Sequence, residues 1–416
     1  MHEKLKTILV VVESIDVEDS SGSKANVALI KNLHKAGFDL QVYHYTRNNI
    51  DLPGIPCYHI KENRKSFVFY LSRLERYLRY WLKINPNKYI ENFFGFSFTL
   101  FNDRNSIVAG LKKIRDFEPD LVLTLSKGGS FRPHHALLKL PKWHLKWMAY
   151  IHDPYPMHAF PRPYDWVEPG HQQKRKFFLK VVNKARYAAY PSKLLADWMR
   201  SYYGELKGKT VIIPHQIDDD KFESPALPEF FKKEAFTIVH AGALMSARNP
   251  IGLIRAFKKF LQEMPEATSD SQLLFLGKKS RYSLEFEKIK EEIPQFFASE
   301  DYVPFSTVLA IQQNAAVNVI LEAKGPISPF LPGKFPHCIQ AEKPILLLGP
   351  YYSESRRLFG DDYPWWGEID DEDKILIMIK ELYHNWKTNQ DKQAYDTREL
   401  KSYLSEKYLS LQLSKL

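Results

Sequence analysis

The chain alternates short apolar runs of strand length with longer stretches of helical hydrophobic spacing. In the first half, apolar runs occupy residues 7–12, 39–45, 121–125 and 147–151, and a helical pattern fills about 24–36. The second half repeats this order, with runs at 237–240, 253–260, 272–276, 307–313, 317–321 and 345–348. Strands that alternate with helices predict parallel α/β sheets, so the expected fold class is α/β with Rossmann-like sheets.

The stretch 328–348, SPFLPGKFPHCIQAEKPILLL, joins a Pro/Gly loop to a short helix and then to a buried strand. Gly333 and the prolines interrupt regular structure, and Lys334 follows at the expected helix start. Unpaired backbone N–H groups and the helix dipole favour an anion there. The stretch therefore indicates a phosphate site, although an isolated Gly-Lys also fits an ordinary loop with a solvated lysine.

The length of 416 residues predicts two domains, because one hydrophobic core rarely grows to that size. The segment 211–222, VIIPHQIDDDKF, ends an apolar strand in a Pro-His-Gln turn. We place the junction there, which gives domains 1–214 and 215–392. Apolar residues recur at helical spacing in 398–416, so this terminal segment is expected to form a docked helix.

Charge and cysteine content narrow the classes of ligand and compartment. The 59 Lys and Arg residues exceed the 49 Asp and Glu residues, and the net charge of +10 favours polyanions, anionic membrane surfaces or phosphorylated small molecules. Cys57 and Cys338 lie far apart, which excludes a disulfide framework and a CxxC metal motif. No apolar window has the length of a signal-peptide core or a membrane span, so we expect a soluble or peripheral protein in a reducing compartment.

Segment 61–105 departs from the alternating pattern. It is aromatic and basic, with apolar side chains at roughly helical spacing and Arg73, Arg76, Arg79 and Lys83 between them. This composition fits an amphipathic helix at a membrane surface. It equally fits a long helix that packs its apolar side on the first domain and leaves the arginines in water.

The chain resembles the retaining GT-B glycosyltransferases that use nucleotide-sugar donors. The resemblance is to the group 1 or family 4-like type, which includes bacterial surface-polysaccharide enzymes. The resemblance covers nearly the whole length, and the order and spacing of five motifs carry it. These motifs are SSGSKAN, IHDPYP, VIIPHQIDDDKF, HAGALMSARNPIGLIRAF and PGKFPHCIQAEKPIL. It implies two Rossmann-like domains that face each other across a cleft, with the C-terminal helix returning to the N-terminal, acceptor-side domain.

The resemblance also assigns residues of the first domain. Gly22 and Ser23 lie in the small-residue turn before a helix, where a diphosphate or acceptor can approach the backbone closely. His152 follows a strand at the end expected to face the cleft, and similar enzymes place a histidine there against the donor sugar. Asp153 is the expected partner that orients its imidazole.

In the second domain, the resemblance implies that Arg248 and Lys334 neutralise the leaving nucleoside diphosphate, so no metal and no other cofactor is required. Further donor contacts are expected at Gly242, Gly277, Val303 and His337. The chain departs from the family at a pair of glutamates, whose positions hold Pro329 and His337. That departure leaves the donor sugar and the nucleotide base open.

The implied function is transfer of a hexose-type sugar, with retention, from a nucleoside diphosphate donor to a glycan or lipid-linked acceptor in polysaccharide biosynthesis. The expected location is the cytoplasm, at the inner membrane face, and no nucleic acid partner is expected. Two alternatives stay open: an epimerase or phosphorylase-like enzyme of the same fold, and a non-catalytic basic protein that binds membrane or nucleic acid through 61–105. Nicotinamide chemistry is disfavoured, because no GxGxxG follows an expected strand.

Overall fold

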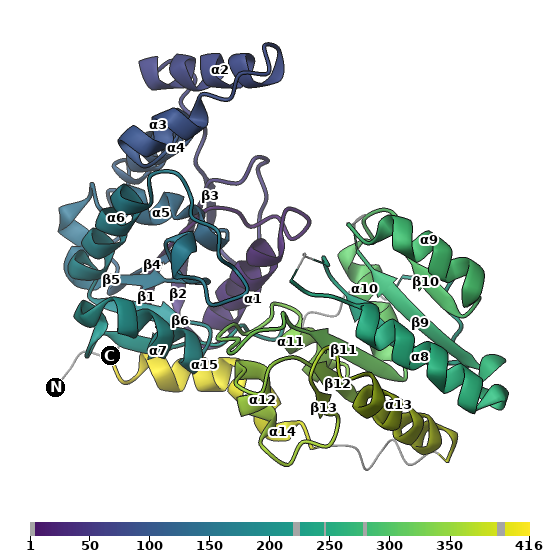
Figure 1. Cartoon of the computed structure of the whole chain (residues 1–416). Helices are drawn as coiled ribbons and strands as arrows, with labels where there is room; N and C mark the ends of the chain where they lie inside the picture. Colours follow the sequence, from purple (N-terminus) through teal and green to yellow (C-terminus); the bar gives the residue numbers. More distant parts are fainter. Residues whose placement is uncertain (1–4, 219–224, 245–246, 278–280, 389–395) are drawn as a thin grey trace. The chain divides into compact units, whose positions relative to one another are not determined.

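The computed structural model describes residues 5–218, 225–244, 247–277, 281–388 and 396–416. The chain forms two compact units, each built on its own parallel sheet (Figure 1). The first unit contains Met1–Phe160, Tyr164–Gln216 and Ser405–Leu416, and the second contains Pro161–Pro163 and Ile217–Leu404. The predicted α/β fold class with two Rossmann-like sheets is confirmed.

Within the described residues, the sheet of the first unit has seven parallel strands in the order β3-β2-β1-β4-β5-β6-β7. The side chains of β1 alternate between the two faces of the sheet. Leu9 and Val11 are buried in the core on one face, and Ile8 and Val10 in the core on the other. A strand buried on both faces reads as a continuous apolar run. The strands are β1 (Thr7–Val12), β2 (Asp39–His44), β3 (Cys57–His59), β4 (Leu121–Leu125), β5 (Trp147–Tyr150), β6 (Tyr187–Tyr190) and β7 (Thr210–Ile212).

Helices cover both faces of this sheet. Helices α1 (Ser21–Lys35) and α15 (Glu406–Leu413) contribute to the core on one face. The other face is covered by α4 (Phe98–Leu111), α5 (Arg132–Leu137), α6 (His171–Lys184) and α7 (Lys193–Tyr202). Short 3₁₀ helices lie at η1 (Gly128–Ser130), η2 (Pro141–Lys146), η3 (Met157–Ala159) and η4 (Gly204–Leu206).

Segment 61–105 is three helices, not one long helix. They are α2 (Phe67–Tyr80), α3 (Asn87–Phe94) and α4, and the chain breaks where Lys83 adopts a left-handed φ of 57° and Pro86 precedes α3. The fully buried residues of α2 are Ser72 and Glu75, and Leu71 and Leu78 on the same side are partly buried. A second row of apolar residues, Phe67, Tyr70, Leu74 and Tyr77, is exposed, so the alternative in which the whole apolar side packs on the domain is wrong for this row.

The second sheet has six parallel strands among the described residues, in the order β10-β9-β8-β11-β12-β13. They are β8 (Phe236–Ala241), β9 (Ser271–Leu276), β10 (Phe296–Ala298), β11 (Val317–Leu321), β12 (Ile345–Leu348) and β13 (Trp366–Gly367). The helices of this unit are α8 (Ile251–Glu263), α9 (Ser283–Glu292), α10 (Phe305–Asn314), α11 (Phe335–Gln340), α12 (Glu354–Phe359), α13 (Glu372–Lys387) and α14 (Arg398–Tyr403), with the 3₁₀ helix η5 (Pro265–Thr268).

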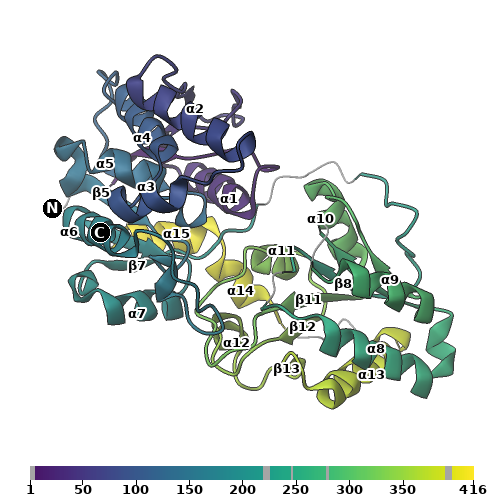
Figure 2. The same ribbon diagram turned by 45° about the horizontal axis from the view of Figure 1, so that its top comes forward.

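The C-terminal segment divides between the two units. Helix α14 belongs to the second unit and α15 to the first, where α15 lies beside α1 in both views (Figures 1 and 2). Ser405 separates the two helices, and its side chain accepts a hydrogen bond from the backbone N–H of Lys407 as an N-cap. Leu409 and Leu413 are buried in the first unit's core. The predicted return of the terminal helix is confirmed, although the returning helix begins later than residue 398.

Both sheets reverse their strand order next to the first strand. In the first unit the chain runs outward from β1 to β3 and then crosses to β4 on the other side of β1; in the second unit β8 and β11 have the same relation. Open parallel sheets bind ligands outside the carboxyl ends of the strands at such a switch point. The residues that follow β1, β4, β8 and β11 are therefore the first places to look for a site.

Candidate functional site

Two glycines shape the switch point of the second unit. Gly242 follows β8 with a φ of 134°, and a Cβ there would lie 3.3 Å from the Nζ of Lys334. Gly277 follows β9, and a Cβ there would lie 2.8 Å from the carbonyl oxygen of Gly242. Side chains at these positions would collide with the lysine or the neighbouring loop, so the glycines allow both loops and Lys334 to meet. The two positions predicted from the sequence thus adjoin each other and Lys334.

The Nζ of Lys334 lies 2.7 Å from the Nε2 of His240, a buried residue of β8. Burial and the nearby charges of Lys334 and Arg248 hold the pKa of His240 well below its usual value. The imidazole is therefore neutral and its Nε2 accepts the hydrogen bond from the lysine. Desolvation of the ammonium, together with the charge of Arg248, lowers the pKa of Lys334 to about 7.

Arg248 is the second cation at this switch point. Its charge acts on Lys334, on His240 and on the carboxyl of Glu322. Within the described part of the chain, neither Arg248 nor Lys334 forms an ion pair with a carboxylate. The charges of Arg248 and Lys334 repel each other, and an anionic ligand bound beside them would relieve this repulsion.

Glu322 follows β11 directly and was missed in the sequence analysis. It is buried; its Oε1 accepts a hydrogen bond of 2.6 Å from the hydroxyl of Ser355, and its Oε2 has no partner among the described residues. Burial raises the pKa of Glu322 to about 7, against the opposing effects of the hydrogen bond from Ser355, the nearby Ser328 hydroxyl and the charge of Arg248. A carboxyl directly after an apolar strand next to the switch point was the signal that could have identified it.

Two more residues of the second unit, Val303 and His337, were predicted to contact the donor. Val303 packs on the cluster that contains the carboxyl ends of β8 and β9. His337 lies on α11, one turn after Lys334, with its ring 5.0 Å from that of Phe305. Glu342, the carboxylate nearest to the missing glutamate positions in the sequence, pairs with Lys401 and is not part of the cation cluster.

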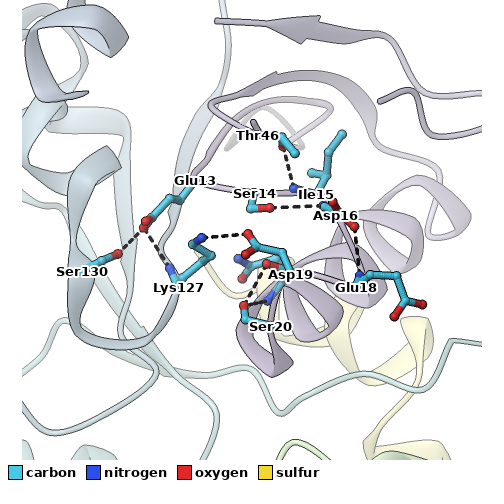
Figure 3. A network of polar contacts seen from close by, with 12 residues as sticks. Glu13, Ser14, Ile15, Asp16, Glu18, Asp19, Ser20, Thr46, Lys127 and Ser130 are labelled. Carbon is cyan, nitrogen blue, oxygen red and sulfur yellow. Dashed lines mark hydrogen bonds and ion pairs between the residues drawn. The ribbon is translucent and has the colours of Figure 1, made fainter. Parts of the chain in front are cut away.

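The switch point of the first unit holds a dense polar network around Glu13, which follows β1 (Figure 3). Its carboxylate accepts hydrogen bonds from the backbone N–H of Lys127 at 3.0 Å and from the hydroxyl of Ser130. Arg132 bridges Glu13, at 2.7 Å, to Asp103, at 2.6 Å. The network fixes the loops after β1 and β4 against each other.

Gly22 and Ser23 lie in the first turn of α1 beside this network. Ser20 is the N-cap of the helix, and its Oγ accepts a hydrogen bond of 3.1 Å from the backbone N–H of Ser23. A Cβ at Gly22 would lie 3.4 Å from the Cα of Lys127, so the turn packs closely on the loop after β4. The structure places both predicted residues at the carboxyl end of the sheet, with the buried Ser23 hydroxyl engaged by Ser20 at 2.9 Å.

His152 follows β5 and is buried except for 9% of its surface. Its Nε2 lies 3.1 Å from the Oδ1 of Asn26, whose Nδ2 donates to the carbonyl of Ser126. Since the amide oxygen must accept, Nε2 carries the proton and Nδ1 keeps its lone pair. Burial and the neighbouring imidazoles of His215 and His134 hold the pKa of His152 well below its usual value.

Two further residues, His215 and Asp153, lie near His152. The ring of His215, from the turn after β7, stacks on His152 with centroids 5.8 Å apart. The carboxylate of Asp153 lies close to Gly128, where a Cβ would be 3.1 Å from Oδ2. In the structure, Nε2 of His152 is held by Asn26, a residue of α1 that the sequence analysis did not identify.

The described residues contain no group of three or more His, Cys, Asp or Glu side chains placed to hold a metal ion. None of the helices described is both long and apolar enough to span a bilayer.

No protein-family model and no curated protein sequence matches the chain. Solved structures match it over nearly its full length. One is a structure described as "Trehalose-6-phosphate from E. coli bound with UDP-2-fluoro glucose", with a TM-score of 0.64, 10% identity and 99% of each chain covered. Another is an α,α-trehalose-phosphate synthase (UDP-forming) from Burkholderia xenovorans in complex with glucose-6-phosphate, with a TM-score of 0.61, 10% identity and 99% coverage of each chain.

A third similar structure is the N-terminal domain of trehalose-6-phosphate phosphatase from Candida albicans, with a TM-score of 0.60 and 14% identity, covering 100% of this chain and 96% of that one. Sequence identity is low in all three comparisons, so they establish the fold of the chain and not its activity. The topology of the two sheets and this full-length likeness together show the GT-B fold.

Proposed function

We propose that the chain is a glycosyltransferase that moves a sugar, with retention, from a nucleoside diphosphate donor to a glycan or lipid-linked acceptor. In this proposal it acts in the cytoplasm in polysaccharide biosynthesis and is of the family 4-like, bacterial surface-polysaccharide type. The observation that carries the proposal is the pair of cations Lys334 and Arg248 at the switch point of the second unit, neither of which pairs with a carboxylate in the described residues. The similar structures with bound UDP-2-fluoro glucose and glucose-6-phosphate support it.

The donor diphosphate is proposed to bind at this cation pair. A lysine whose pKa has fallen to about 7 regains its proton when an anion binds beside it, so binding relieves the repulsion between Lys334 and Arg248. Arginine offers a planar fork that suits phosphate oxygens, and lysine adds a point charge. Gly242 and Gly277 let the two loops and Lys334 lie together at this point, because side chains there would meet the lysine or the neighbouring loop backbone.

In the proposed reaction, the bond between the anomeric carbon and the diphosphate oxygen breaks while the acceptor hydroxyl attacks from the same face. The departing phosphate oxygen takes the hydroxyl proton, so no side-chain base is needed. Lys334 and Arg248 stabilise the negative charge that develops on the leaving group, the type of electrostatic stabilisation that commonly dominates enzymatic rate enhancement. The expectation that no metal takes part stays a prediction.

His152 is proposed to contact the sugar. Its imidazole is neutral, and the bond from Nε2 to Asn26 fixes the ring so that Nδ1 is an acceptor. A neutral acceptor suits a sugar hydroxyl and does not suit a phosphate oxygen, which needs donors. Gly22 and Ser23, at the start of α1, are proposed to border the acceptor or diphosphate.

Two measurements test the proposal. The first is the melting temperature of the protein with a panel of nucleoside diphosphates and their sugars, because a ligand at 100 times its dissociation constant adds about 2.7 kcal/mol to stability. The second is release of the nucleoside diphosphate with glycan acceptors, with and without a chelator, and with the anomeric configuration of the product read by NMR. We expect the nucleoside diphosphate of one base to raise the melting temperature, and the product to keep the anomeric configuration of the donor sugar.

Each alternative predicts a different result. An epimerase would return an isomeric nucleotide sugar without transfer, and a phosphorylase-like enzyme would require inorganic phosphate. If no nucleoside diphosphate or nucleotide sugar raised the melting temperature, the cation pair would not be a donor site and the proposal would be wrong.

A further inference from the structure

Helix α2 presents an apolar stripe to solvent. Its residues follow each other at alternating steps of three and four, which places them on one side of a helix. Three of the most exposed aromatic side chains, Phe67, Trp81 and Tyr89, each expose 76% of their surface. The exposed stripe and its continuation through the turn into α3 consist of Phe67, Tyr70, Leu74, Tyr77, Trp81, Leu82, Ile84, Tyr89, Phe93 and Phe94.

The side of α2 that faces the protein mixes polar residues with the partly buried Leu71 and Leu78, and it leaves the exposed stripe outside the packing. Ser72 and Glu75 are its buried residues, and the N-cap Ser66 donates a hydrogen bond of 2.7 Å to Asn102 of α4. Figure 1 shows α4 between α2 and the sheet of this unit, so α2 is on the outside of the unit. Exposed apolar patches of this extent on soluble proteins mark an interaction surface.

The charge around the stripe identifies the partner. Residues 61–94 contain eight Lys and Arg residues against three Glu residues, which leaves half of the chain's net charge of +10 in this segment. Each of the three glutamates is buried or engaged. Glu62 pairs with Arg73, Glu75 is buried, and Glu91 pairs with Lys174. The outward surface therefore combines aromatic side chains with uncompensated positive charge.

We propose that α2, the following turn and α3 dock the protein on an anionic lipid bilayer surface. Trp and Tyr side chains favour the headgroup region, and each Lys or Arg near an anionic surface strengthens binding about fivefold. A second copy of the chain fits this face poorly, because two copies would bring like charges together. A bilayer with anionic phosphates can bury the apolar stripe among its lipids and pair its negative charge with the Lys and Arg residues. This inference concerns location and does not rest on the proposed transfer reaction.

The test is co-sedimentation of the full-length protein with vesicles of phosphatidylcholine, with and without phosphatidylglycerol, at low and high salt. We expect binding to the anionic vesicles that high salt reverses, and weak binding to phosphatidylcholine alone. The variant Phe67→Ser/Trp81→Ser is expected to lower binding on the order of 100-fold, since it removes two large apolar side chains. The matched control Leu145→Ser/Trp166→Ser changes two exposed apolar residues of the same unit outside the segment and should bind like wild type.

A second pair of variants tests the charge. Lys83→Gln/Lys88→Gln should lower binding roughly 30-fold, because each charge contributes about 1 kcal/mol at the surface. The control Lys232→Gln/Lys233→Gln removes two exposed lysines of the second unit and is expected to leave binding unchanged. Quenching of tryptophan fluorescence by brominated lipid should fall in Trp81→Phe and persist in Trp166→Phe.

Three results would overturn the inference. One is no binding to anionic vesicles at low salt by a folded protein. Another is equal loss of binding in the segment variants and in their controls. The third is concentration-dependent self-association that Phe67→Ser/Trp81→Ser abolishes while vesicles bind nothing, which would assign the face to a second copy. Vesicle binding needs no sugar donor, so these results are independent of the transferase assay.

Discussion

At the scale of single residues, Lys334 joins the electrostatics of the free protein to the binding of an anion. Its ammonium lies beside the neutral imidazole of His240, and burial together with the charge of Arg248 lowers its pKa to about 7. A protein keeps such a lysine at a cost in stability, and perturbed groups of this kind concentrate at functional sites. The same residue therefore makes testable predictions about stability and about binding.

The first prediction concerns the pH dependence of stability. The pKa of Lys334 is about 7 in the folded protein, against an ordinary lysine pKa of 10.5. Between these values the unfolded chain binds the proton and the folded protein does not, so Lys334 makes the free energy of unfolding rise with pH. In Lys334→Met this contribution is absent. Urea unfolding between about pH 7 and 10 should show a steeper rise for wild type than for the variant, and parallel curves would contradict the assigned pKa.

Glu322 gives a prediction of the opposite sign. Burial raises its pKa in the folded protein to about 7 from the ordinary glutamate value of 4.5, so the folded protein keeps a proton that the unfolded chain loses in this range. This group therefore lowers stability as pH rises from 4.5 to 7, and the loss is complete above 7. The variant Glu322→Gln cannot ionise, so its stability relative to wild type should increase with pH across that window. A difference that does not change with pH would show that Glu322 is already ionised in the folded state.

His152 is predicted to act on the sugar and not on the phosphate. In His152→Ala we expect kcat to fall by at least tenfold and the affinity for the free nucleoside diphosphate to change little, because the lost contact concerns a sugar hydroxyl. Single-turnover rates and calorimetric titration of the diphosphate measure the two effects. An equal loss in both would move His152 to the phosphate side.

The sequence identified part of this chemistry at the residue scale. Lys334 was predicted from its loop and Gly242 and Gly277 from the family resemblance, and the structure brings the three together. Glu322 and the partner of His152, Asn26, were missed, because a hydrogen bond between residues 126 positions apart follows from the fold and not from a local pattern. The glutamate nearest to the family positions, Glu342, was easy to see in the sequence but pairs with Lys401 instead.

At the scale of elements, buried strands were the most predictable features. The run 7–12 became β1 and 317–321 became β11 with the expected bounds, since a strand buried on both faces has a continuous apolar sequence. Short edge strands such as β13 have too few residues to show a pattern. Helix α2 was the hardest case, because an amphipathic pattern does not tell which side faces the protein.

Helix α15 is expected to stabilise the first unit through its buried side. Leu409 is fully buried in the first unit's core, whereas Leu411 of the same helix exposes 53% of its surface. Leu409→Ala is expected to destabilise the protein by about 2 to 5 kcal/mol, and Leu411→Ala by less than about 0.5 kcal/mol. Thermal unfolding followed by circular dichroism measures both. Equal small effects would show that the returning helix contributes little to the first unit.

At the scale of the whole molecule, the expectations of two parallel sheets and of a returning terminal helix are confirmed, and the full-length likeness to solved structures shows the GT-B fold. This success has a physical basis, since alternating strands and helices with right-handed crossovers leave few possible topologies. Fold alone does not determine chemistry, so donor and acceptor depend on the residues at the switch points. The outward aromatic face of α2 is a separate feature of the molecule, with its own test.

Calorimetric titration of the nucleoside diphosphates decides whether Lys334 and Arg248 form the donor site. The proteins compared are wild type, Lys334→Ala, Arg248→Ala and the control Arg255→Ala. Arg255 is an exposed arginine of α8 in the same unit, paired with Glu372. If Lys334 and Arg248 hold the diphosphate, each of their variants should bind it about 10- to 150-fold more weakly, since a hydrogen bond to a charged group contributes about 1.5 to 3 kcal/mol. The control and wild type should bind alike. Wild-type affinity in both Lys334→Ala and Arg248→Ala would contradict the account.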